Sequence, residues 1–177
     1  NEKYGFDLPE DTVENRIFAA VHYYDYSFGM EESMTKTEFD EAKVDAIAEA
    51  CEKLVTRFTS RGIPVIMGEY GAINKNNPKQ RAYHNEVFNL LCKKAGVVPV
   101  YWDQGWYDRS AEPADYSFTL VDRKIYQSID KEVTDGLMRG FFADDDKDVK
   151  DLVVSPEITD ITGITLKDSE VCLEIGS

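Results

Sequence analysis

Three short hydrophobic runs, at residues 17–21, 64–67 and 97–101, stand out along the chain. Each is rich in aliphatic residues and lacks a regular alternation with polar ones. This pattern is typical of strands that are covered on both faces, as in a parallel sheet.

The segments between and after these runs have helical periodicity. Residues 41–61 carry apolar side chains at steps of three and four and stop at Gly62, which predicts an amphipathic helix. Residues 78–95 show one apolar face, two lysines in the last turn and then Gly96. Residues 130–142 repeat the pattern, so the order strand, helix, three times over, predicts a parallel α/β sheet.

The end of the chain differs in composition. Residues 143–151 contain five aspartates without apolar periodicity, which predicts a solvated acidic linker. The aspartates lack the central Gly and terminal Glu of an EF-hand, so no metal site is predicted. Residues 161–176 alternate loosely between apolar and polar positions, as short strands do.

Charge and cysteine content narrow the function classes. The formal net charge of −14 argues against nucleic acid as a partner, because phosphate binding relies on clustered cations. No run of 18 apolar residues could span a bilayer, so no membrane partner is expected. The three cysteines form no Cys-x-x-Cys pair, and Cys51 and Cys92 are expected to be small core residues of helices.

The residues that follow the hydrophobic runs carry the candidate chemistry, since the carboxyl ends of parallel strands build the site in α/β folds. Glu69 lies between Gly68 and Gly71 after the second run, where a nucleophile would be accessible; from spacing alone it could equally cap the next helix. His22 and Trp102 follow the other two runs. Singly they are ordinary strand-end and core residues, but together they offer a carboxylate, hydrogen-bond donors and a flat indole for a pyranose ring.

Competing catalytic motifs are absent from the sequence. It has no glycine-rich phosphate loop, no His-Glu-x-x-His pair and no Gly-x-Ser-x-Gly elbow. The second histidine, His84, is inside a predicted helix and is expected at the surface. The sequence therefore favours carboxylate chemistry and implies neither a metal nor an organic cofactor.

Three blocks of sequence, residues 14–24, 61–72 and 98–105, resemble in the correct order the last three strands of glycoside hydrolase family 5. The likeness runs over roughly residues 8–142. It implies the C-terminal three βα units of a TIM (β/α)8 barrel, which is α/β in class, followed by a short β tail. The residues of this chain that match the family's site are the nucleophile Glu69, the sugar-lining pair His22 and Tyr24, the stacking Trp102, and the next-sugar contacts Ala72 and Lys75.

Some residues depart from the family pattern. Tyr101 and Gln104 replace the Trp and Asn of Trp-Trp-Asp-Asn-Gly, and Tyr70 stands where Phe is common. These are expected to influence substrate preference. The segment 118–123 is similar to a Phe-x-Leu-x-Asp-Arg stretch after the eighth strand, where a structural role is expected.

The acid/base partner is the larger departure. Retaining hydrolysis needs two carboxyl groups roughly 5 Å apart. In the family the second belongs to an Asn-Glu-Pro motif, and no such tripeptide occurs in the 177 residues. The chain is therefore expected to be a fragment whose acid/base lies in a missing N-terminal part, and to associate with that part or with a second copy because its sheet edges would be bare.

A second resemblance concerns residues 161–176, which are similar to the opening of bacterial immunoglobulin-like domains of family 2. The expected organisation is a partial barrel over residues 1–142, an acidic linker over 143–156 and the start of an immunoglobulin-like domain over 157–177.

The function expected from these observations is a retaining endo-β-1,4-glucanase of the cellulase type, acting on a β-glucan and located outside a bacterial cell or on its surface. Two alternatives stay open. One is a carbohydrate-binding or scaffold module that has lost catalysis, and the other is an unrelated α/β sandwich in which the three blocks are core and caps.

Overall fold

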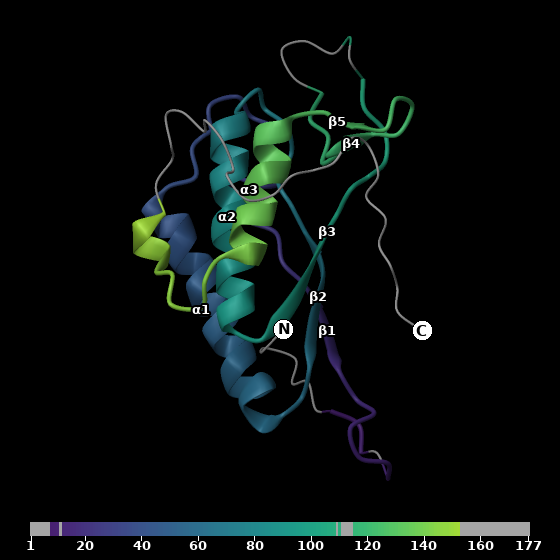
Figure 1. The fold of residues 1–177 in the computed structure, drawn as a ribbon, viewed down its shortest axis with the longest axis vertical. Helices are drawn as coiled ribbons and strands as arrows, with labels where there is room; N and C mark the ends of the chain where they lie inside the picture. Colours follow the sequence, from purple (N-terminus) through teal and green to yellow (C-terminus); the bar gives the residue numbers. More distant parts are fainter. Residues whose placement is uncertain (1–7, 11, 109, 111–114, 153–177) are drawn as a thin grey trace.

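The computed structural model describes residues 8–10, 12–108, 110 and 115–152. Three parallel strands form one sheet in the order β1 (Ala19–His22), β2 (Val65–Tyr70), β3 (Val97–Tyr101). Helices α1 (Glu41–Arg57), α2 (Pro78–Lys94) and α3 (Lys131–Phe142) all lie on the same side of this sheet (Figure 1). The three predicted strand–helix pairs are confirmed.

The helix boundaries follow from local sequence. Asp40 caps α1 by accepting a hydrogen bond from the Lys43 amide at 3.2 Å. The helix ends at Arg57, a short 3-10 turn η2 (Thr59–Arg61) follows, and Gly62 then adopts a left-handed φ of 75°. Helix α2 begins at Pro78, which suits the first turn because proline has no amide hydrogen to leave unpaired.

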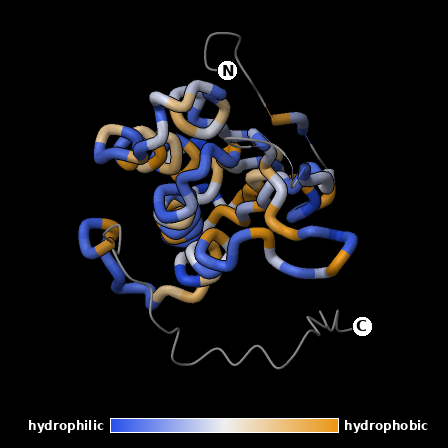
Figure 2. Tube along the Cα trace, turned by 90° about the horizontal axis from the view of Figure 1, so that it is seen from above, coloured by the Kyte–Doolittle hydropathy of each residue, from blue (hydrophilic) through white to orange (hydrophobic). Residues whose placement is uncertain are grey.

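Hydrophobic side chains fill the layer between sheet and helices. The largest core cluster joins alternate residues of β2 with the inner faces of α1 and α2, including Val65, Met67, Ile47, Val87 and Phe88. Seen from above, hydrophobic stretches of the trace run through the middle of the molecule (Figure 2). The core therefore lies on one side of the sheet only.

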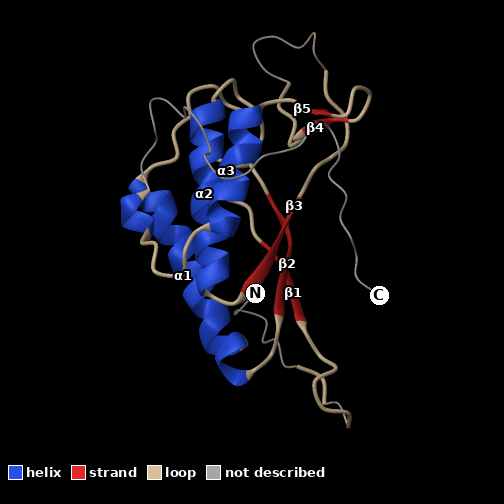
Figure 3. Cartoon of the chain, viewed as in Figure 1, coloured by secondary structure: helices blue, strands red, loops and turns tan. Residues whose placement is uncertain are grey.

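The opposite face of the sheet carries no helix among the described residues (Figure 3). Its apolar side chains are consequently exposed, with Val98 at 60% and Val100 at 46% of their maximal accessible surface. Strands β1 and β3 are both edge strands in this sheet. A face of this kind is normally covered in a folded protein.

Helices α2 and α3 pack closely at two glycines of α3, Gly136 and Gly140. A Cβ atom on Gly136 would lie 2.3 Å from the Ala82 carbonyl oxygen, so only glycine permits this approach. Arg139 of α3 also donates to Glu86 of α2 at 2.7 Å. The position of α3 on the helix layer is thus set by backbone contact.

The prediction that His84 lies at the surface is wrong. Its side chain is 1% exposed and packs among the rings of Phe28, Phe39 and Phe88. Helix α2 is contacted by the sheet, α1 and α3, so it buries polar as well as apolar residues. Cys51 and Cys92 are buried free thiols, as expected.

The acidic stretch after α3 is held more firmly than a solvated linker would be. Its aspartate side chains are exposed, but Lys93 donates to the Ala143 carbonyl and Lys94 to the Asp145 carbonyl. A 3-10 turn η3 (Val149–Asp151) follows, and Leu152 is buried in the main core. Apolar residues at the end of this stretch therefore tie it to the helix layer.

A short antiparallel hairpin of β4 (Val121–Asp122) and β5 (Gln127–Ser128) was not predicted. The proposed immunoglobulin-like start at 157–177, and the linker end at 153–156, lie outside the described residues. Among the described helices, none is long and apolar enough to cross a bilayer.

Candidate active site

The carboxyl ends of the three strands form one edge, and the ladder continues just beyond them. His22 pairs with Glu69, and Tyr70 pairs with Tyr101. The Tyr23 amide then donates to the Glu69 carbonyl at 3.0 Å, and the Trp102 amide to the Tyr70 carbonyl at 2.8 Å. The predicted residues at the three strand ends are therefore neighbours.

Glu69 and Trp102 belong to the same face of the sheet. Tyr70 is 1% exposed and stacks on Phe88 of α2, with ring centroids 4.1 Å apart. Tyr101 meets Tyr70 edge-on at 5.2 Å within the same helix-covered layer. Strand β2 is irregular in register between Met67 and Tyr70, so the direction of Glu69 follows from its neighbour Tyr70. Adjacent side chains point to opposite faces, and Glu69 and Trp102 therefore project away from the helix-covered layer. The indole of Trp102 is 44% exposed there.

Two side chains approach the same carboxylate oxygen of Glu69. The Tyr24 hydroxyl donates to Oε2 at 3.1 Å, and His22 Nδ1 lies 3.5 Å from Oε2. Both side chains come from the end of β1 and the residues just after it. This arrangement orients the carboxylate through one oxygen, and within the described residues no hydrogen bond to the other oxygen, Oε1, is formed.

The phenol of Tyr24 is fixed and stays protonated. Its ring contacts Phe118 edge-on, with centroids 5.7 Å apart. Burial, followed by the hydrogen bond to Glu69 and the negative charge there, raises the pKa of Tyr24 well above its ordinary value. Tyr24 is therefore a hydrogen donor to Glu69 throughout the neutral range.

The glycines on both sides of Glu69 make room for other groups at the site. A Cβ on Gly68 would lie 3.3 Å from His22 Nε2, and one on Gly71 would lie 3.0 Å from Phe118 Cδ1. Gly68 thus accommodates the imidazole, and Gly71 accommodates the ring that supports Tyr24. Both positions therefore favour glycine because a Cβ atom would crowd a neighbouring side chain, and not because the backbone must be flexible there.

Ala72 and Lys75 are not gathered around Glu69 in the same way. Both are 1% exposed. The Lys75 ammonium donates to the Lys36 carbonyl at 2.6 Å and lies 5.3 Å from the Phe28 ring centroid. Burial lowers the pKa of Lys75. In this structure both residues have partners inside the protein, and their contact with a sugar stays a prediction.

The expectation that Tyr70 and Tyr101 influence substrate preference is not supported by where they lie. Tyr70 accepts a hydrogen bond from Asn89 Nδ2 at 2.6 Å in the core. The Tyr101 hydroxyl donates to the Ala72 carbonyl at 3.4 Å, and Arg81 reaches both of these groups. Their hydroxyls therefore organise the helix-side core behind the site.

Phe118 is a site residue that sequence reasoning treated only as structural. It supports the Tyr24 ring directly, and its amide donates to Gln104 Oε1 at 3.2 Å. The signal was present in the segment 118–123, but the sequence alone did not indicate that it folds back over the ends of β1 and β2.

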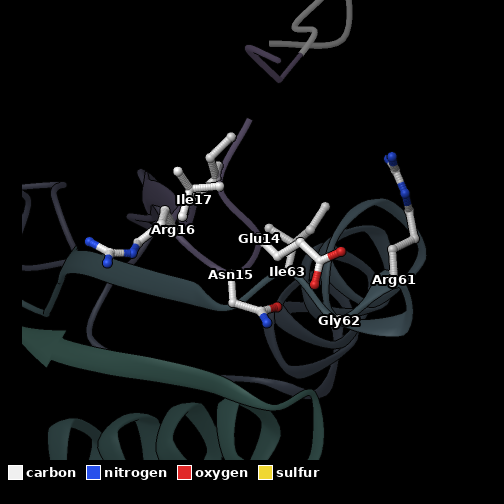
Figure 4. Close-up of a pocket in the computed structure, with 8 residues that line it drawn as sticks. Glu14, Asn15, Arg16, Ile17, Arg61, Gly62 and Ile63 are labelled. Atoms are coloured by element: carbon white, nitrogen blue, oxygen red, sulfur yellow. The ribbon is translucent and has the colours of Figure 1, made fainter. Parts of the chain in front are cut away.

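One cavity lies at the opposite end of the sheet. Figure 4 shows a pocket of about 240 Å³ lined by residues 13–17 and 61–63, which precede β1 and β2. It is therefore at the amino end of the strands, opposite Glu69. In α/β sheets of parallel strands the amino end serves stability more than chemistry.

Comparison with known proteins identifies the family. The model of cellulase (glycosyl hydrolase family 5) matches residues 1–108, more than half of the chain. The chain belongs to glycosyl hydrolase family 5. Endoglucanase A of Clostridium longisporum, a curated relative, is 29% identical in an alignment of 142 residues that covers 77% of this chain and 26% of the relative.

Solved structures agree with this assignment. A family 5 broad-specificity endoglucanase from Ruminococcus champanellensis with bound cellotriose matches with a TM-score of 0.66 at 29% identity, over 75% of this chain and 37% of that one. A family 5 xyloglucanase from Paenibacillus pabuli matches with a TM-score of 0.68 at 26% identity, over 78% and 44%. The chain thus spans about a quarter of that curated relative and less than half of these solved chains.

These matches define the fold class. The three βα units of this family 5 chain correspond to part of a TIM barrel, with its open sheet face being the inner face of that barrel. The predicted fold class and family are confirmed.

Proposed function

We propose that this family 5 chain carries the nucleophile side of a retaining endo-β-1,4-glucanase, with Glu69 as the nucleophile. The observation that carries the proposal is the convergence of Tyr24 and His22 on Glu69 Oε2, on the sheet face where Trp102 is exposed. These groups can orient a carboxylate beside a sugar ring held on an indole.

The chemistry has two steps. Glu69 Oε1 attacks the anomeric carbon and forms a glycosyl ester, while the bond from that carbon to the leaving sugar oxygen breaks and an acid donates a proton to that oxygen. Water then attacks the same carbon, the acid/base takes a proton from it, and the ester bond to Glu69 breaks. Tyr24 keeps its hydrogen bond to the Glu69 side chain through both steps, because its raised pKa keeps the hydroxyl protonated.

The acid/base belongs to a segment outside these 177 residues in this proposal. The sequence has no Asn-Glu-Pro tripeptide, and the chain covers 26% of the length of Endoglucanase A. That segment would also cover the exposed Val98 and Val100 and pair with the open strand edges. A second copy of the chain is the alternative occupant of this face. We call the protein that includes the preceding segment the full-length protein.

The proposed substrate is a β-linked glucan. The relatives include proteins named as endoglucanase and xyloglucanase, and one was solved with cellotriose bound. Such polymers are too large to enter a cell, so we propose that the protein acts outside the cell or on its surface.

The test compares Glu69→Gln with Glu49→Gln in the full-length protein, using reducing-sugar release from a soluble β-glucan. Glu49 is a matched control because its side chain is 67% exposed on α1. We expect Glu69→Gln to lose at least about a thousandfold in rate and Glu49→Gln to lose nothing. Proton NMR of the first product should show the β anomer, because two inversions retain configuration. Glucan binding without turnover by the unmodified protein would instead favour a non-catalytic binding module.

A further inference from the structure

Both tryptophans of the chain lie in the loop that follows β3. Trp102 is 44% exposed and Trp106, four residues later, is 57% exposed. A large aromatic side chain left open to solvent at the edge that carries a candidate site is a typical binding feature. Trp102 belongs to the site already described, whereas Trp106 has no role in it.

The loop that carries Trp106 is firmly held at its base by Asp103. Its two carboxylate oxygens accept hydrogen bonds from the Gly105 amide at 2.8 Å and from the Leu120 and Val121 amides at 3.1 and 3.3 Å. Arg123 lies 3.5 Å from the same carboxylate. A single side chain therefore joins the loop to residues 120–123.

The loop is also fixed on either side of Trp106. Gln104 Oε1 accepts a hydrogen bond from the Phe118 amide at 3.2 Å, and the Thr119 hydroxyl donates to the Trp106 carbonyl. Gly105 has a φ of 80°, and a Cβ there would lie 2.5 Å from Arg123 Nη1. The backbone at Trp106 is thus held in place while its indole remains open.

These anchors connect Trp106 to the nucleophile through few contacts. Thr119, which binds the Trp106 carbonyl, is next to Phe118, which packs on Tyr24. Tyr24 in turn donates to Glu69. The backbone of Trp106 is therefore positioned relative to Glu69 by the same segment that supports the Tyr24 ring. A stacking platform needs a fixed backbone of this kind, because ordering a mobile loop would cost binding free energy.

We propose that Trp106 is the stacking platform of a second sugar subsite, which binds a glucosyl unit of the β-glucan other than the one at Glu69. The inference rests on the proposed function and adds to it a determinant of chain-length preference. Trp106 contacts no reacting atom in this account. It contributes binding free energy only for substrates long enough to reach it.

The experiment measures kcat/KM for cello-oligosaccharides of increasing length with the full-length protein and its Trp106→Ala variant. Adding the glucosyl unit that reaches Trp106 should raise kcat/KM in the unmodified protein, and Trp106→Ala should lose about tenfold at that length and above. Shorter substrates should be cleaved at unchanged rates. Trp106→Tyr should restore most of the loss, since a smaller aromatic ring still stacks.

Tyr126→Ala is the matched control, because Tyr126 is 85% exposed and lies outside this loop, between β4 and β5. It should leave the length profile unchanged. An equal loss for Trp106→Ala at all lengths, together with a lowered melting temperature, would overturn the inference and indicate that the indole packs against the preceding segment. An unchanged profile would also overturn it. Failure of the unmodified protein to cleave any of these sugars would refute the proposed function itself, a result distinct from both.

Discussion

The hydroxyl of Tyr24, just after β1, donates a hydrogen bond at 3.1 Å to Oε2 of Glu69, which lies in β2. Removing this donor is the most local perturbation of the nucleophile that the chain allows. In the full-length protein, Tyr24→Phe should lower kcat by about 10- to 100-fold, because a hydrogen bond to a charged group contributes about 1.5 to 3 kcal/mol. Steady-state kinetics on a soluble β-glucan measure this change. Tyr126→Phe is the control, and an unchanged kcat in Tyr24→Phe would show that the contact has no catalytic role.

Gly71 tests whether Phe118 positions Tyr24. In Gly71→Ala the new Cβ would lie 3.0 Å from Phe118 Cδ1, so the ring must shift and Tyr24 with it. We expect kcat to fall by about tenfold while the KM stays within about twofold, since the effect is on the orientation of Glu69. A change in KM alone, with kcat intact, would contradict this role for Phe118.

His84 makes stability depend on pH. Burial among aromatic rings lowers its pKa from 6.5 to about 4. Between these two values the unfolded chain binds a proton that the folded chain excludes, so the free energy of unfolding falls as the pH drops from 6.5 toward 4. The loss from this residue is about 3 kcal/mol at most. Denaturant unfolding over this pH range should show a shallower dependence in His84→Phe, and an identical dependence would argue against a neutral buried imidazole.

Gly136 reports on the contact between α2 and α3. Gly136→Ala places a methyl group 2.3 Å from the Ala82 carbonyl oxygen, so the helices must separate. We expect a loss of roughly 2–3 kcal/mol in the free energy of unfolding. Lys53→Ala, which removes an i,i+4 ion pair with Glu49 on α1 that is exposed on both sides, should cost less than about 0.5 kcal/mol. Equal midpoints for the two variants in urea would contradict the close approach.

Leu152 is expected to hold the acidic stretch against the helix layer. It is 7% exposed in the main core, whereas Asp151 beside it is exposed. Leu152→Asp should increase amide hydrogen exchange over residues 143–152 because the segment loses its apolar anchor. Asp151→Asn should leave the exchange unchanged. If the two variants exchange alike, Leu152 does not hold the segment.

Much of this architecture could be predicted because its signals are local. Strand β3 matches its hydrophobic run residue for residue, and α1 and α2 begin at Glu41 and Pro78, where the predicted helices begin. Helix α1 ends earlier than predicted, at Arg57, and a 3-10 turn continues to Gly62. That Glu69, His22 and Trp102 lie near one another could be predicted from one rule: the carboxyl ends of parallel strands lie at the same edge of a sheet.

The features that were missed depend on tertiary contacts. Helix α2 is contacted by the sheet, α1 and α3, and it buries His84 and Asn85 because they bond to each other at 3.2 Å, a pairing that periodicity does not show. The expected influence of Tyr70 on substrate preference likewise overlooked a core contact, because its hydroxyl accepts a hydrogen bond from Asn89. The burial of Leu152, inside the predicted linker 143–156, likewise depends on apolar contacts with distant parts of the chain.

Trapping of the glycosyl intermediate would identify the nucleophile by its covalent bond to the sugar. The full-length protein would be incubated with a 2-deoxy-2-fluoro β-cellobioside bearing a good leaving group, which slows hydrolysis of the ester, and the digested protein would be analysed by mass spectrometry. We expect a fluorinated cellobiosyl adduct on the carboxylate of Glu69 and none in Glu69→Gln. An adduct on another carboxylate, or turnover of the probe by Glu69→Gln, would contradict this expectation.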